Sequence, residues 1–100
     1  MKGYESLEDV LHRALDRAAK GKGKERHADG LPFGEQPWVR ICERHGIGYP
    51  LGQVDKKLVE QYKLPTEQRI DELLDVIVYT AMSIIHIEKE GRDGHDGKAV

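Results

Sequence analysis

The chain has little of several features that define common protein classes. Its single cysteine, Cys42, excludes an internal disulfide and a cysteine-rich zinc site, and it suits a reducing compartment. Its most apolar stretch, residues 73–87, is interrupted by polar side chains and is shorter than the ~20 apolar residues that span a bilayer. No apolar segment follows the first charged residues, so we expect no secretory signal, no membrane partner and a cytoplasmic protein.

Neither sign of charge dominates the sequence. Sixteen Lys and Arg residues stand against eighteen Asp and Glu residues, which gives a formal net charge of −2 at pH 7. A protein near neutrality lacks the bulk positive charge that draws proteins to nucleic acids or to acidic membranes. Nucleic acid is therefore the least favoured partner, and its binding would depend on a basic edge made of Arg13, Arg17, Lys20, Lys22 and Lys24.

Helical periodicity is present along most of the chain, and no strand pattern of useful length accompanies it. Apolar residues recur at intervals of three and four, which predicts helices over residues 7–20, 37–45, 51–63 and 66–90. Residues 47–50 are interpreted as a turn. The fold class that follows is all-α. Its core is a hairpin of the two longer helices, 51–63 and 66–90, with two shorter N-terminal helices packed against it.

One hundred residues correspond to one domain, which we place at residues 1–91, followed by a disordered tail over residues 92–100. The helix at 66–90 is apolar around most of its circumference. The remaining ordered residues are too few to cover it. We therefore predict a homodimer or a higher oligomer that completes the bundle, in which this helix pairs with its symmetry mate.

Polar residues inside this apolar helix form one line. Glu72 and Asp75 lie one turn apart, so both carboxylates can point at the same spot, as a Mg²⁺ ion requires. A solvated helix face is the alternative, but unpaired carboxylates among apolar neighbours are costly. The line consists of Gln68, Glu72, Asp75, Tyr79, Ser83 and His86.

The segment Glu72 to Tyr79 resembles the second metal-binding helix of the MazG-type all-α nucleotide pyrophosphohydrolases, which carries Glu-x-x-Asp before an apolar run. The resemblance extends over residues 51–90. It implies a helical bundle assembled from two or more chains. It also implies Mg²⁺-dependent cleavage of nucleoside triphosphates to a monophosphate and pyrophosphate. In that case Glu72 and Asp75 hold the metal, and Glu60 adds a ligand across the dimer.

The preceding helix departs from the family pattern, which is Glu-Glu-x-x-Glu. Here Lys56 and Lys57 occupy the region of the acidic ligands, and the nearby acids Asp55 and Glu60 lie ~140° apart around the helix. One chain therefore cannot build the family's complete metal cluster. The site is degenerate, or the lysines contact phosphate, or only the hairpin is shared. Whether the chain is an enzyme stays open, and no catalytic residue is assigned.

A second basic segment lies between the first two predicted helices. Lysines alternate there with glycines, and such a segment can either fold over a phosphate chain or serve as a solvated linker. Residues 26–37 also resemble segments of small phage and prophage proteins. The candidate phosphate contacts are Lys56, Lys57, Lys24 and Arg26.

Two functional hypotheses follow from different classes. The first is a MazG-like protein that binds or hydrolyses a nucleotide or a similar phosphate ligand with Mg²⁺. The second is a non-enzymatic, phage-type accessory protein that acts by binding another protein. The sequence does not distinguish the base or the sugar of a ligand.

Overall fold

The structure is a computed structural model that describes residues 1–20 and 30–92. All of its regular elements are helical, and the described residues contain no strand, which confirms the predicted all-α class. The elements in chain order are α1 (Glu5–Lys20), the 3-10 turn η2 (Phe33–Glu35), α2 (Pro37–His45), α3 (Gly48–Glu60), the 3-10 turn η3 (Gln61–Lys63) and α4 (Thr66–Arg92).

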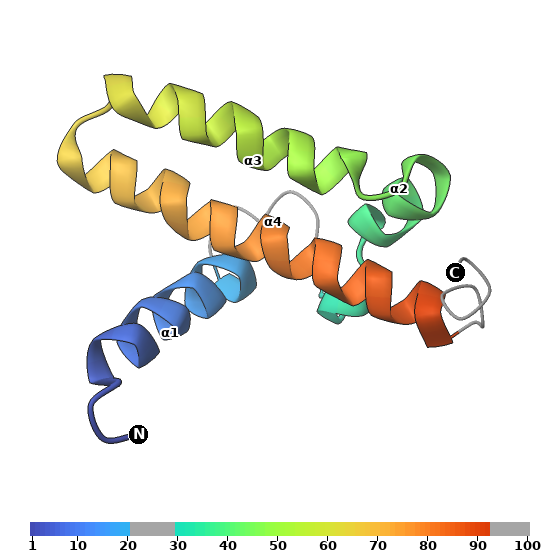
Figure 1. Cartoon of the computed structure of the whole chain (residues 1–100), viewed down its shortest axis with the longest axis horizontal. Helices are drawn as coiled ribbons and strands as arrows, with labels where there is room; N and C mark the ends of the chain where they lie inside the picture. The colour runs from blue at the N-terminus through green and yellow to red at the C-terminus, as the bar shows by residue number, and fades with distance from the viewer. Residues whose placement is uncertain (21–29, 93–100) are drawn as a thin grey trace.

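Helices α3 and α4 form the predicted antiparallel hairpin (Figure 1). Leu64 is extended between them, because Pro65 disfavours helical geometry in the residue before it. The turn is held by a side-chain contact across it, in which Arg69 Nε donates a hydrogen bond of 2.8 Å to Gln61 Oε1. Gln61 is buried, so this bond satisfies a polar group that has lost contact with water.

Three details of the predicted helices are wrong. The turn placed at residues 47–50 is mostly the first turn of α3, where Pro50 is tolerated because the amide groups of a first turn have no helical partner. The N-terminal helices are not both the shorter ones, since α1 has 16 residues and α3 has 13. Helix α4 continues through Gly91 to Arg92, two residues beyond its predicted end. Residues 93–100 lie outside the described residues.

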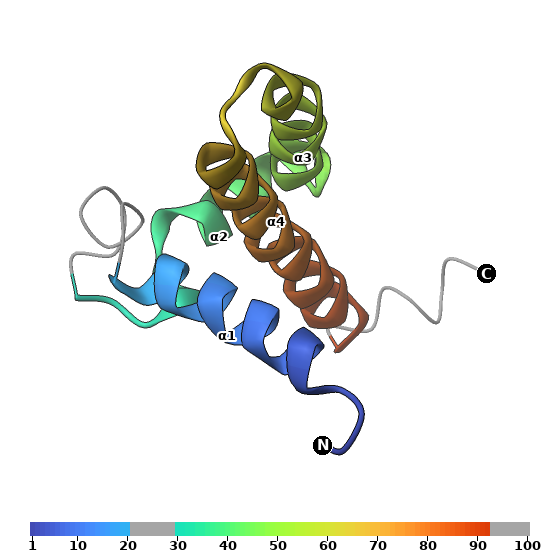
Figure 2. The ribbon, with the colours of Figure 1, turned by 90° about the vertical axis from the view of Figure 1, so that its left-hand side faces the viewer.

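Helix α4 lies between α3 on one side and α1 on the other, and α2 packs near the start of α3 and the C-terminal half of α4 (Figures 1 and 2). The core at this junction contains Trp38 and Cys42 from α2 with Met82 from α4. Trp38 Nε1 donates a hydrogen bond of 2.9 Å to the Phe33 carbonyl, and the two rings are 5.2 Å apart. This bond joins α2 to the 3-10 turn that precedes it.

No helix among the described residues combines the length and the hydropathy needed to cross a membrane. Burial raises the pKa of the Cys42 thiol, which keeps the thiol protonated and unreactive. Cys42 is therefore a core residue.

We expect Trp38→Ala to lower the free energy of unfolding by about 3–5 kcal/mol, because it removes a buried ring and leaves a cavity beside Met82. Chemical denaturation followed by far-UV circular dichroism measures this change. The matched control is Val59→Ala on the exposed surface of α3, for which we expect a change within about 0.5 kcal/mol. Equal effects of the two substitutions would contradict the assigned core.

Candidate functional site

The polar line of α4 faces the protein interior from Glu72 onward. The side chains of Glu72 and Asp75 are only 22% and 23% exposed, and Ser83 and His86 are buried. Gln68, at the N-terminal end of the line, is exposed. The alternative of a solvated face therefore fails for most of this line, and the carboxylates need partners from neighbouring helices.

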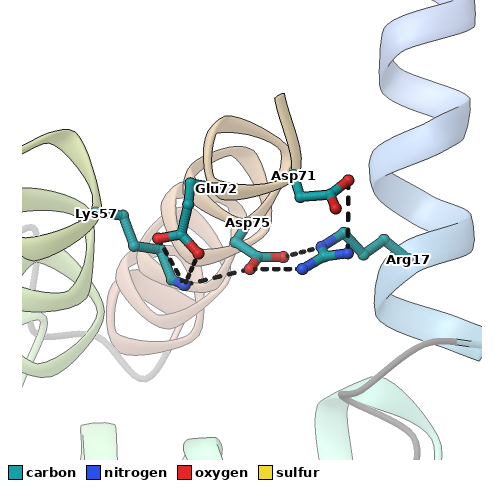
Figure 3. A network of polar contacts seen from close by, with 5 residues as sticks. All are labelled: Arg17, Lys57, Asp71, Glu72 and Asp75. Atoms are coloured by element: carbon teal, nitrogen blue, oxygen red, sulfur yellow. Dashed lines mark hydrogen bonds and ion pairs between the residues drawn. The ribbon is translucent and has the colours of Figure 1, made fainter. Parts of the chain in front are cut away.

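Helix α1 supplies the first partner of these carboxylates, Arg17 (Figure 3). Its Nε lies 2.6 Å from Asp75 Oδ1, its Nη2 lies 3.3 Å from Asp75 Oδ2, and its Nη1 lies 3.7 Å from Asp71 Oδ1. The planar guanidinium thus makes the two-point contact with a carboxylate that it forms best. The hydrogen bond to Asp75 raises the pKa of Arg17 above its usual value, so the cation is permanent.

Helix α3 supplies the second partner, Lys57. Its Nζ lies 3.4 Å from both carboxylate oxygens of Glu72 and 3.2 Å from Asp75 Oδ2. Figure 3 shows the ammonium between the two carboxylates, with Asp75 bound by α3 on one side and by α1 on the other. Two cations thus face the three carboxylates of Asp71, Glu72 and Asp75, which leaves the ion-pair cluster with one net negative charge.

Arg17, Lys57, Glu72 and Asp75 of the ion-pair cluster form one wall of an open cavity of about 310 Å³, which is lined by residues of α1, η2, α2, α3 and α4. Aromatic side chains form much of the remaining wall. Tyr49 and Tyr79 contact each other edge to face, with ring centres 6.3 Å apart, and Lys57 Nζ lies 5.9 Å from the Tyr79 ring centre. Burial raises the pKa of the Tyr49 phenol, so it stays neutral at physiological pH. The cavity therefore combines fixed charges with aromatic surface, and the two adjoin where Lys57 faces Tyr79.

The structure brings together three of the residues predicted for the site, Glu72, Asp75 and Lys57. Lys56, which precedes Lys57 in α3, is exposed, and Glu60 is exposed at the C-terminal end of α3. Lys24 and Arg26 lie outside the described residues.

Sequence reasoning missed Arg17, because it assigned this residue to a basic edge of the first helix. A signal was available in the spacing. Val10, Ala14 and Arg17 follow one another at i, i+4 and i+7, and the structure partly buries Val10 and buries Ala14. A cation at the third position of this apolar row indicates an acidic partner on the helix opposite.

The residues present fit Mg²⁺ in one specific way. No group of three acidic, histidine or cysteine side chains gathers at metal-binding distance within residues 1–20 and 30–92. Glu72 and Asp75 nevertheless converge on a cation, which is the Lys57 ammonium. Two carboxylates are a common protein contribution to a Mg²⁺ ion whose other ligands are water and a substrate's phosphates. The pair therefore fits a Mg²⁺ ion that arrives with a phosphate ligand.

No family model, curated protein or solved structure matches this chain. The likeness of residues 72–79 to the MazG-type helix therefore remains a prediction.

We expect Asp75→Asn to lower the free energy of unfolding by about 1.5–3 kcal/mol, since it removes the one carboxylate that binds both cations. The control is Asp9→Asn, which breaks an exposed pair with Arg13 one turn along α1 and costs about 0.5 kcal/mol or less. Thermal and urea denaturation of the three proteins measure the difference. A change of the same size in both variants would show that the ion-pair cluster adds no more than a surface pair.

Proposed function

We propose that the chain binds a nucleotide in the cavity between its four helices, in the manner of a MazG-like protein. The observation that carries this proposal is the joint presence of two cations, two converging carboxylates and several aromatic side chains around one cavity. Its volume of about 310 Å³ lies at the lower end of the ~300–1,000 Å³ typical of small-ligand sites.

The charged wall is the phosphate end of the proposed site. Arg17 and Lys57 are the two side-chain types that proteins use most for phosphate, one as a planar fork and the other as a point charge. Both form ion pairs with carboxylates of α4. Phosphate oxygens replace these carboxylate oxygens when the ligand binds, so binding is an exchange of partners.

The exchange leaves Glu72 and Asp75 available to a divalent cation. Mg²⁺ bound there would neutralise phosphate charge and activate a water molecule. The MazG-like resemblance supports cleavage of a nucleoside triphosphate as the reaction. No described side chain is assigned as general base, so binding is the function proposed and hydrolysis is its extension.

The aromatic wall is the base end of the proposed site. Trp38, Tyr49 and Tyr79 line it together with Val78 and Met82. Every nucleobase has a flat π face, and contact with aromatic side chains contributes about 1–3 kcal/mol per base without selecting its identity. The wall therefore favours a ligand that has both a base and a phosphate over inorganic phosphate.

The test is thermal denaturation with nucleoside mono-, di- and triphosphates, each with and without Mg²⁺. A ligand at ~100 times its Kd stabilises the fold by about 2.7 kcal/mol, which gives a clear upward shift of Tm. We expect this shift for a triphosphate with Mg²⁺. We expect Lys57→Gln to abolish it, because this variant removes the cation that contacts both carboxylates.

The matched control is Lys63→Gln, which changes an exposed lysine in η3 and should leave the shift intact. A panel without any shift in the wild-type protein would overturn the proposal. The same holds if Lys57→Gln responds as the wild-type protein does.

We also propose that the chain forms a homo-oligomer. Among the described residues, five hydrophobic side chains are buried in the core. Many large hydrophobic side chains of α1, α3 and α4 are exposed to solvent. This imbalance is typical of a chain whose core is completed by association. The same exposed surface favours the second functional candidate, an accessory protein that binds another protein, and a flat nucleotide panel would direct the search there.

A further inference from the structure

An apolar groove lies beside the ligand cavity, between α1 and α4. Its volume is about 630 Å³. No charged side chain of the described residues lines it, and Gln36 is the polar residue at its margin. Its main apolar lining consists of Leu11, Leu15, Leu31, Phe33, Ile77 and Ala81.

Helix α1 carries a row of large apolar side chains that its own chain leaves uncovered. Leu7, Leu11 and Leu15 are 51%, 48% and 60% exposed, and their spacing of four places them on one face. The residue of α1 that is buried is Ala14. The helix therefore packs on α4 through small residues, and its leucines project beside the groove.

The groove continues along α4 in the same manner. Ile77, Ala81 and Ile84 follow at i, i+4 and i+7, so Ile84, which is 54% exposed, extends the groove wall toward the C-terminal half of the helix. Together α1 and this face of α4 form one apolar surface. The surface has protruding leucines on α1 and a floor of small residues, Ala14 and Ala81, between the helices.

We propose that this α1–α4 surface is the one on which a second copy of the chain docks. A two-fold interface brings the same surface together from both copies, so it must be complementary to itself. This surface meets that requirement, because the leucine row of one copy can enter the alanine-floored groove of the other. The described residues that line the groove carry no charge, so they bring no like-charge repulsion to the contact between identical faces.

The size of the surface suits a small dimer interface. Helix α1 has 16 residues, which makes it about 24 Å long, and two adjacent helices are about 20 Å wide. Its projected footprint of about 500 Å² per copy, about 1,000 Å² for both copies, is at the lower limit for a specific interface. The small buried core also indicates a partner that is always present, and a second copy is such a partner.

This inference rests on the proposed homo-oligomer and is independent of the nucleotide. It places the contact between copies on α1 and α4 together. The sequence instead predicted that α4 alone pairs with its symmetry mate. The groove and the ligand cavity share Ala18, Phe33, Gln36 and Val78. The second copy is therefore seated directly beside the ligand site.

Sedimentation velocity over a micromolar concentration series tests the proposal. We expect the wild-type chain to be a dimer, and Leu11→Glu and Leu15→Glu each to raise its dissociation constant by more than about tenfold, equivalent to about 1.4 kcal/mol. Leu15 is more exposed than buried, so Leu15→Glu leaves the fold of one chain intact, and circular dichroism checks this. The matched control is Val59→Glu, at a position 68% exposed on α3, which should stay dimeric.

Each other outcome overturns part of the proposal. A monomeric wild-type chain removes both the homo-oligomer and this interface. A dimer that neither leucine variant weakens keeps the oligomer and removes the α1–α4 surface. A dimer that only Val59→Glu weakens assigns the contact to the outer face of α3.

Discussion

The rest of the structure depends on the double pairing of Asp75 with Arg17 and Lys57. A half-buried carboxylate is tolerable only where cations compensate it, and these two cations come from helices on opposite sides of α4. A shift of α1 or α3 along α4 would separate a charge from its partner and leave it poorly solvated. The ion pairs therefore favour one register for three helices that bury few hydrophobic side chains. They also determine which side chains surround the cavity.

The cluster gives the cavity a selectivity that a bare carboxylate pair would lack. Lys57 already occupies the place between Glu72 and Asp75, so a free divalent cation gains contact with the carboxylates only by displacing an ammonium that then lacks a partner. An anion alone is also disfavoured, because it would take the cations from Glu72 and Asp75 and leave these carboxylates without partners. Under the proposed function, a metal and a phosphate that enter together satisfy both sets of charges. The pairing therefore favours the joint ligand over either component.

Sequence reasoning succeeded where one helix determines the answer and failed where two helices must be placed. The spacing of Glu72 and Asp75 was enough to put both carboxylates on one face, and Pro65 was enough to place the hairpin turn. The spacing within α1 could place Arg17 in the row of Val10 and Ala14, but its pairing with Asp75 depends on the crossing of α1 over α4, which no interval within α1 specifies. The start of α3 was misplaced because Pro50 and two glycines are typical of a turn, although a first helical turn accepts them.

Trp38 is the single tryptophan of the chain, and it lies in the wall of the cavity. Its indole is buried, bonded to the Phe33 carbonyl and stacked at a tilt against the Phe33 ring. All tryptophan fluorescence of the protein therefore originates at one point beside the proposed base end of the site. The native chain carries its own optical probe of this cavity, so its occupancy can be followed by emission without any label.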